Sequence, residues 1–221
     1  LHGLLHSFPT RRSSDLHQFW VGSPLPAAYR EFAEGWRRLH PGWAYRLWTD
    51  AHLPVLRNRE LYDAAGRLCP GFAGQLRADV LRYELLYLFG GVWVDTDFEP
   101  RMPLDKLLEG VSCFAAWERQ DNVVNNAIMG AVPGHPFLAR LVEALPASVL
   151  AGKGKRRPSK VSGPHFLTAQ YRAHPEGVTV FGQELFYPYR CDQLHRASED
   201  FPKAYAVHHW ANQRRLRRRP L

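Results

Sequence analysis

The chain has 221 residues, of which 45% are hydrophobic and 13% aromatic, so it can bury a sizeable core and is not globally disordered. No apolar run approaches the ~20 residues of a membrane-spanning helix, and three cysteines without metal-ligand spacing argue against a disulfide framework or a zinc site. The net charge of +8 is concentrated in residues 153–160 and 214–221, which leaves the rest of the chain mildly acidic.

The first sixteen residues look foreign to the protein. The segment 7–16 resembles the translation of a common sequencing-adapter primer. We therefore expect residues 1–16 to be an assembly artefact outside the fold, a domain over residues 17–213, and a basic tail over residues 214–221.

The first elements of the domain are predicted to be a strand, a helix and a strand. An apolar run over residues 17–21 ends at a Gly-Ser-Pro turn, and helical spacing of apolar residues follows over 26–39. A second short strand is predicted over 45–48. This order is a βαβ unit, which favours an α/β fold with a mostly parallel central sheet flanked by helices.

A long helix leads directly into an acidic pair. Apolar residues recur at helical spacing over 74–89, Gly90 and Gly91 end the helix, and an apolar strand over 92–94 runs into Asp95-Thr96-Asp97. Further strands are predicted over 111–117, 127–132, 178–181 and 204–208. Further helices are predicted over 136–145 and 161–174.

Asp95 and Asp97 are the proposed centre of the chemistry. Residues i and i+2 of an extended chain point the same way, so both carboxylates can face one point. Hard oxygen ligands suit Mg²⁺ or Mn²⁺, and such an ion can hold a diphosphate. Asp79 and Arg82 share one face of the preceding helix and can hydrogen-bond sugar hydroxyls, unless they form only a surface salt bridge.

These motifs together resemble a known family. The run from Ala78 to Asp97 is similar to the DXD sugar-binding region of glycosyltransferase family 32, and more distantly to the glucosyltransferase domain of the clostridial cytotoxins. Matches elsewhere include His17-Gln-Phe-Trp20, Asn125-Asn126, Ser162-Gly-Pro and His208-His209-Trp210. The resemblance implies a GT-A type nucleotide-sugar-binding fold.

The resemblance also implies roles for matching positions. Asp79 and Arg82 would bind the donor sugar, and Asn125 or Asn126 would touch the sugar or orient the reacting centre. Trp20 would stack on the nucleotide base, unless it is a core aromatic, and Trp93 would lie near the donor or simply pack. Asp97 is an implied metal ligand. Asp95 would bind the metal, ribose or sugar. His208 would bind the metal or the diphosphate, unless it is structural.

The predicted function is transfer of a sugar from a UDP- or GDP-sugar to a glycan or glycolipid acceptor, with Mn²⁺ or Mg²⁺ and retention of configuration. Polysaccharide or glycoconjugate synthesis, such as that of bacterial capsule, is the process that the resemblance suggests. We expect a cytoplasmic protein, and the basic segments could contact an anionic membrane surface at its inner face.

Two rival functions remain open at this stage. A metal-dependent phosphohydrolase or nuclease would need a third carboxylate, such as Asp79, to converge on the acidic pair. A nucleic-acid-binding module would use the basic segments, but it leaves the acidic pair unexplained.

Overall fold

The protein is described by a computed structural model that covers residues 15–152 and 157–211. Its main sheet has six strands in the order β2-β1-β3-β6-β5-β7. The strands are β1 (Asp15–Phe19), β2 (Ala44–Trp48), β3 (Gly91–Val94), β5 (Cys113–Arg119), β6 (Val123–Ala131) and β7 (Thr179–Phe181). Only β6 is antiparallel to its neighbours, which confirms the predicted mostly parallel sheet.

Helices and a small second sheet cover the two faces of the main sheet. The longer helices are α1 (Ala27–Leu39), α4 (Ala73–Phe89), α5 (Pro136–Ala151) and α7 (Pro164–Ala173). Short helical segments are α2 (Arg59–Asp63), α3 (Ala65–Leu68), α6 (Pro158–Val161), α8 (Gln183–Phe186) and a 3₁₀ turn at Leu194–Ser198. Strands β4 (Phe98–Pro100) and β8 (Ala206–His208) pair antiparallel as the second sheet.

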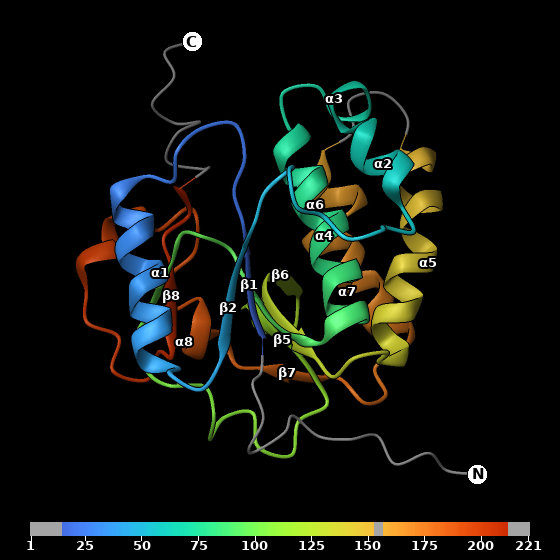
Figure 1. Ribbon diagram of the computed structural model, residues 1–221. Helices are drawn as coiled ribbons and strands as arrows, with labels where there is room; N and C mark the ends of the chain where they lie inside the picture. The colour runs from blue at the N-terminus through green and yellow to red at the C-terminus, as the bar shows by residue number, and fades with distance from the viewer. Residues whose placement is uncertain (1–14, 153–156, 212–221) are drawn as a thin grey trace.

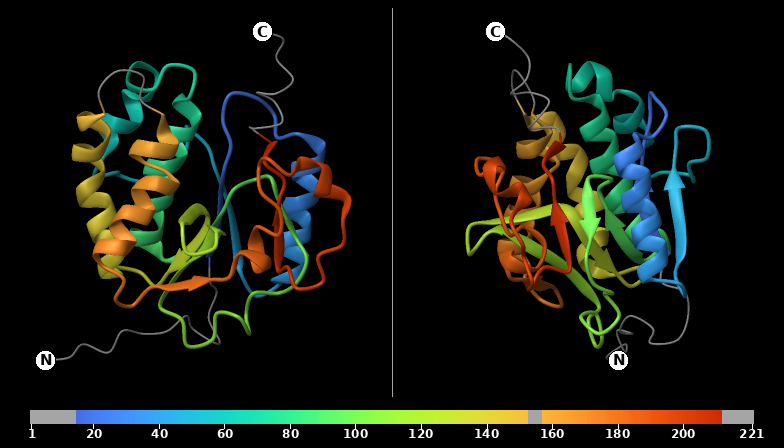
Figure 2. Two further views of the ribbon diagram at one scale, coloured as in Figure 1. Left: turned by 180° about the vertical axis from the view of Figure 1, so that it is seen from behind. Right: turned by 90° about the vertical axis from the view of Figure 1, so that its left-hand side faces the viewer.

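The result is three layers. Helices α4, α5 and α7 lie on one side of the main sheet, while α1, α8 and β8 lie on the other (Figure 1). The reverse view in Figure 2 shows the same separation. Each face has its own apolar core: one contains Leu76 and Leu141 from the long helices, and the other contains Trp36, Phe98 and Tyr187.

The predicted βαβ unit is confirmed, with a small shift at its start. Strands β1 and β2 pair in parallel, and α1 connects them. Strand β1 begins at Asp15, two residues before the expected domain boundary, and Leu16 is only 2% exposed. Residues 1–14, which make up most of the expected foreign segment, lie outside the described residues, as do residues 153–156 and the predicted basic tail.

The turn between α4 and β3 requires glycine. Gly90 and Gly91 have φ values of +68° and +87°. A Cβ atom on Gly91 would lie 2.2 Å from the carbonyl oxygen of Asp15, because β3 pairs closely with β1 there. The glycine pair therefore ends the helix and places the acidic motif at the end of β3.

Several predicted boundaries were wrong for identifiable reasons. Helix α5 continues through Pro146 although the prediction ended it there, because the Val142 carbonyl that proline leaves unbonded accepts a hydrogen bond from Asn58 at 2.9 Å. Leu88 and Phe89, predicted on the buried stripe of α4, are 43% and 42% exposed at its end. None of the described helices has the length and hydropathy that crossing a bilayer requires.

Candidate active site

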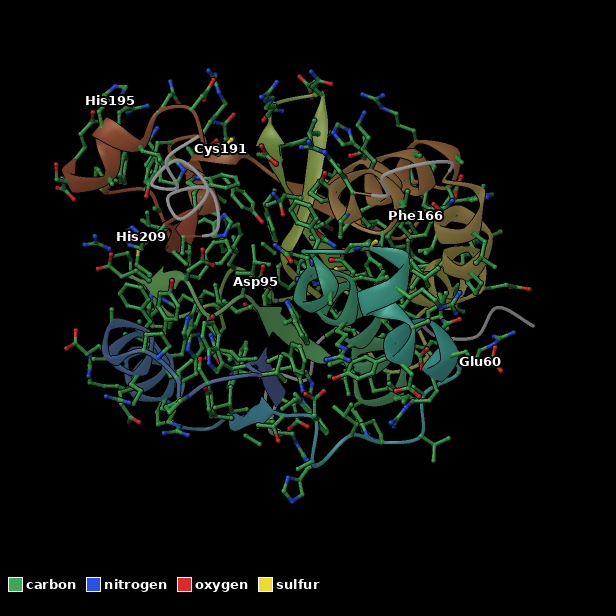
Figure 3. The ribbon with its side chains drawn as sticks, turned by 90° about the horizontal axis from the view of Figure 1, so that it is seen from above. Glu60, Asp95, Phe166, Cys191, His195 and His209 are labelled. Carbon is green, nitrogen blue, oxygen red and sulfur yellow. The ribbon has the colours of Figure 1, made fainter. Side chains whose placement is uncertain are left out.

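The acidic motif lies where parallel strands end. Asp95 directly follows β3, and Trp20 follows β1, its parallel neighbour. The carboxyl ends of parallel strands form the edge at which α/β proteins bind ligands. Figure 3 shows Asp95 near the centre of the molecule when this side is viewed from above.

Asp95 and Asp97 converge, although not through an extended chain. The N–H of Phe98 donates to the carbonyl of Asp95 at 3.1 Å, so the motif forms a turn and the extended geometry that we predicted is wrong. Even so, one oxygen from each carboxylate and one ring nitrogen of His208 all lie within 4.8 Å of one another.

The second sheet brings His208 to the motif. Strand β8 pairs with β4 so that His208 lies opposite Phe98, the residue after Asp97. Its Nε2 lies 3.1 Å from Asp97 Oδ1. Its Nδ1 is buried and has no hydrogen-bond partner in the described part of the chain. The two carboxylates suit Mn²⁺ or Mg²⁺, and the imidazole nitrogen favours Mn²⁺ of the two, so these residues suit the divalent metal that the motif implies.

The charges of Asp97 and His208 support each other. Burial opposes ionisation of Asp97. The charge and hydrogen bond of His208 outweigh this effect, together with the N–H that Ala211 donates, and lower the pKa of Asp97 to about 2. Burial likewise opposes protonation of His208, but Asp97 raises its pKa above the ordinary value. A divalent cation held by Asp95, Asp97 and His208 would require the neutral form of the His208 imidazole.

Asp79 and Arg82 form a buried pair beside this group. Arg82 Nη1 donates to Asp79 at 2.8 Å, and its Nη2 donates to Asp95 at 2.7 Å. The side chains of Asp79 and Arg82 are 6% and 4% exposed, so the surface salt bridge that we considered is wrong. Arg82 Nε is buried and has no hydrogen-bond partner among the described residues.

Trp93 lies under Asp95 and Arg82. Its indole N–H donates to Asp95 Oδ1 at 2.7 Å, and its ring lies 5.1 Å from the Arg82 guanidinium carbon. Trp93 is 1% exposed, so it packs and orients both charged groups. Trp20 is half-buried, with its indole N–H on the Ser23 carbonyl. Base stacking by Trp20 stays a prediction.

Sequence reasoning left Asn125 and Asn126 equivalent, and the structure separates them. Asn126 donates to Asp79 at 2.9 Å and to the Tyr83 hydroxyl at 3.0 Å, on the α4 face of the sheet. Asn125 donates to Glu118 at 2.8 Å on the opposite face. Successive side chains of β6 point to opposite faces, so only one of the two can reach Asp79.

Three partners of these residues were not predicted as site residues: Tyr83, Glu118 and Ser162. Ser162 Oγ donates to Asp79 Oδ2 at 2.6 Å, and the Tyr83 hydroxyl donates to the Ser162 carbonyl at 2.7 Å. Ser162 belongs to the Ser-Gly-Pro segment that the family resemblance includes, which was the available signal. Tyr83 could have been found from its place one residue after Arg82. Burial raises the pKa of Asp79 to about 6 against the opposing effects of Arg82, Ser162 and Asn126.

Comparison with known families identifies the motif region. Residues 26–113 match the model described as a glycosyltransferase sugar-binding region containing the DXD motif. This region includes Asp79, Arg82 and both motif aspartates, and the match confirms the predicted resemblance.

Curated relatives extend the similarity beyond that region. Inositol phosphoceramide mannosyltransferase 3 of Schizosaccharomyces pombe is 33% identical over 89% of this chain and 59% of the relative. Mouse lactosylceramide 4-alpha-galactosyltransferase is 26% identical over 94% of the chain and 52% of the relative. The chain thus spans somewhat more than half the length of these proteins.

Solved structures agree on the fold. The glycosyltransferase PaToxG superposes with a TM-score of 0.55 at 15% identity, over 74% of this chain and 70% of that one. The ligand-free glycosyltransferase domain of the YGT toxin superposes with a TM-score of 0.51 at 9% identity, over 76% of this chain and 80% of that one. The predicted α/β fold of the GT-A type is therefore confirmed.

Proposed function

We propose that this chain, which carries the DXD sugar-binding region of the glycosyltransferases, transfers a hexose from a nucleotide sugar to a hydroxyl acceptor in the presence of a divalent cation. The observation that carries the proposal is the convergence of Asp95, Asp97 and His208 beside the buried Arg82. A bound Mn²⁺ or Mg²⁺ would neutralise charge on the departing nucleoside diphosphate. Asp95, Asp97 and His208 would hold it.

The residues of the chain would supply the remaining electrostatics. Arg82 is fixed by Asp79 and Asp95 beside the convergent group. A preorganised cation in a buried setting stabilises developing negative charge more strongly than one in water. The acceptor's proton can leave to the donor phosphate, so no protein base is required. Retention of configuration, which the family resemblance implies, is part of the proposal.

We further propose a mannosyl donor and a glycolipid acceptor. Two relatives are named for sugar transfer to sphingolipids, inositol phosphoceramide in one case and lactosylceramide in the other. This assignment replaces capsular polysaccharide as the favoured process.

The rival hydrolase is less well supported. Among the described residues, the convergent group consists of two carboxylates and one imidazole. Asp79, the expected third carboxylate, is bonded instead to Arg82, Asn126 and Ser162. A two-metal site needs more anionic ligands than this arrangement provides.

Thermal unfolding with candidate donors tests the proposal. We expect GDP-mannose with Mn²⁺ to stabilise the protein by ~2.7 kcal/mol at a hundredfold excess over Kd. GDP-mannose alone and Mn²⁺ alone should each stabilise it less. UDP-galactose and UDP-glucose serve as competing donors. Asp97→Asn keeps the side-chain shape and an acceptor for the Ala211 N–H but removes the charge. It should lose the Mn²⁺-dependent shift and sugar transfer.

Asp63→Asn is the matched control, because Asp63 is an exposed carboxylate of α2 that pairs only with Arg59 among the described residues. It should behave as the unchanged protein does. Stabilisation of the Asp97→Asn protein by Mn²⁺ and donor at wild-type strength would contradict the ligand assignment. A wild-type protein that none of the three donors stabilises would contradict the proposed function as a whole.

A further inference from the structure

Glu118 is a carboxylate at the edge of the site that the proposed chemistry has not used. It is the second-last residue of β5, and β5 runs parallel to β3 because both are antiparallel to β6. The carboxyl ends of β3 and β5 therefore lie at the same edge of the sheet, as do the residues that follow them. Asp95 follows β3, and Glu118 is one residue before the end of β5.

Three hydrogen bonds, linked through the backbone of Ala127, connect Glu118 to the acidic motif. The N–H of Asp95 donates to the carbonyl of Ala127 at 2.8 Å, and the N–H of Ala127 donates to Asn125 Oδ1 at 2.8 Å. Asn125 Nδ2 then donates to Glu118 Oε2 at 2.8 Å. Asn125 is 4% exposed, so Glu118 is held from one side by a buried amide with both of its polar atoms engaged.

The rest of the Glu118 carboxylate is available to a ligand. The residue is half-buried, and Asn125 is its one hydrogen-bond partner within the described ranges. No lysine or arginine of those ranges forms an ion pair with it. Arg190 and His208 act on Glu118 only through longer-range electrostatics. A half-buried carboxylate without a contact ion pair is costly unless a further donor satisfies it.

Glu118 lies on the face opposite to Asp79. Asn126 reaches Asp79 on the α4 face, so the neighbouring Asn125, with Glu118, points to the face of α8 and β8. Burial is the main cause that raises the pKa of Tyr187 on that face, and the charges of Asp95 and Glu118 add to it. The two carboxylates are therefore both within electrostatic range of one buried ring.

The charge balance indicates the kind of ligand. Arg82 and a divalent cation together would offset the charges of Asp79, Asp95 and Asp97, so the charge of Glu118 interacts with Arg190 and His208 only at longer range than an ion pair. A further anionic group would repel the phosphates of a donor, whereas it would accept a hydrogen bond from a neutral hydroxyl.

We propose that Glu118, held in place by Asn125, binds a hydroxyl of the acceptor on the face of the site opposite the Asp79–Arg82 pair. This inference rests on the proposed function and assigns to it an acceptor subsite. Glu118 contacts the acceptor, and Asn125 is a positioning residue that acts through Glu118.

The test separates acceptor from donor in the Glu118→Gln variant. With GDP-mannose and Mn²⁺, the acceptors are inositol phosphoceramide and lactosylceramide in detergent micelles, and methyl α-mannoside in solution. We expect the KM of the acceptor to rise about 10- to 100-fold, because a hydrogen bond to a charged group is lost. The KM for GDP-mannose, its slow hydrolysis without acceptor and its thermal stabilisation should not change.

Two further variants keep the test decisive if Glu118→Gln is poorly folded. Glu118→Asp retains the charge and should recover part of the acceptor affinity. Asn125→Ser should raise the acceptor KM less than Glu118→Gln does. Glu60→Gln is the matched control, because Glu60 is exposed on α2, well away from Asp95 in Figure 3.

The outcomes are distinct for the two proposals. An unchanged acceptor KM in Glu118→Gln, or an equal loss of donor binding and donor hydrolysis, overturns the acceptor subsite while leaving the transferase intact. A wild-type protein that GDP-mannose stabilises but that transfers to none of the three acceptors also overturns it. A wild-type protein that no sugar nucleotide stabilises refutes the proposed function itself.

Discussion

Removing the hydroxyl of Ser162 should shift the pH dependence of turnover. Ser162 Oγ donates to Asp79 Oδ2 at 2.6 Å, and both residues are buried. Burial raises the pKa of Asp79 to about 6, while Arg82, Ser162 and Asn126 hold it down. Ser162→Ala removes one of these three interactions and leaves the others in place, so the pKa of Asp79 should rise further.

The size of the shift follows from the strength of the lost bond. A hydrogen bond to a charged group contributes ~1.5–3 kcal/mol, and one pKa unit corresponds to ~1.4 kcal/mol. The loss should raise the pKa of Asp79 by roughly 1–2 units, so that Asp79 is about half to nine-tenths protonated at pH 7. Protonated Asp79 no longer forms an ion pair with Arg82, and Arg82 is then held less firmly against Asp95.

The assay is the pH profile of Mn²⁺-dependent turnover of GDP-mannose between pH 5.5 and 9.5. The rising limb should move upward by roughly 1–2 pH units in Ser162→Ala, with activity recovered above pH 8. Ser162→Thr keeps the hydroxyl and should follow the wild type. An unshifted profile in Ser162→Ala, or the same shift in both variants, would refute the reasoning.

Urea unfolding gives an independent check with a defined sign. The pKa of Asp79 is higher in the folded protein than in the unfolded chain, so the folded state binds the proton more strongly. The contribution of Asp79 to stability is therefore largest at low pH and falls as the pH rises through about 6. In Ser162→Ala this fall should extend to higher pH.

Three further predictions concern the scaffold around the site. Burial lowers the pKa of His17, whose Nδ1 accepts a hydrogen bond from Trp48. The free energy of unfolding in urea should therefore fall by up to ~1.4 kcal/mol per pH unit as the pH drops below about 6.5, and less steeply in His17→Gln. Gly91→Ala should lower the stability measured by thermal unfolding by more than ~2 kcal/mol, because the new Cβ would lie 2.2 Å from a β1 carbonyl oxygen. Gly110 has a similar positive φ, but a Cβ there would meet nothing within 4 Å, so Gly110→Ala should cost only ~1–2 kcal/mol. Glu84→Gln should lower the free energy of unfolding in urea by ~1–3 kcal/mol. Both Glu84 oxygens accept hydrogen bonds from backbone N–H groups at 2.6 Å, whereas an amide has only one acceptor oxygen. An unchanged urea midpoint would contradict this prediction.

The local order of elements was predictable because it depends on neighbours in sequence. Helical periodicity, two glycines and an apolar run determined that a helix, a turn and a strand precede Asp95. The spacing of Asp79 and Arg82 placed them on one helix face, and the structure confirms that they pair. The missed continuation of α5 through Pro146 shows the limit of local rules, since a distant asparagine satisfies the carbonyl that proline leaves free.

The site itself was only partly determined by local sequence. The acidic pair and the helix supply Asp79, Arg82, Asp95 and Asp97 from one continuous stretch of chain. His208, Ser162 and Glu118 reach the site from segments whose own periodicity shows only short strands or a helix start. The pairing of β8 with β4 brings His208 to Asp97, 111 residues away, and the packing of α6 and α7 brings Ser162 to Asp79, 83 residues away. Such contacts depend on which faces pack together, and sheet register, not residue type, decides that Asn126 meets Asp79 while Asn125 meets Glu118.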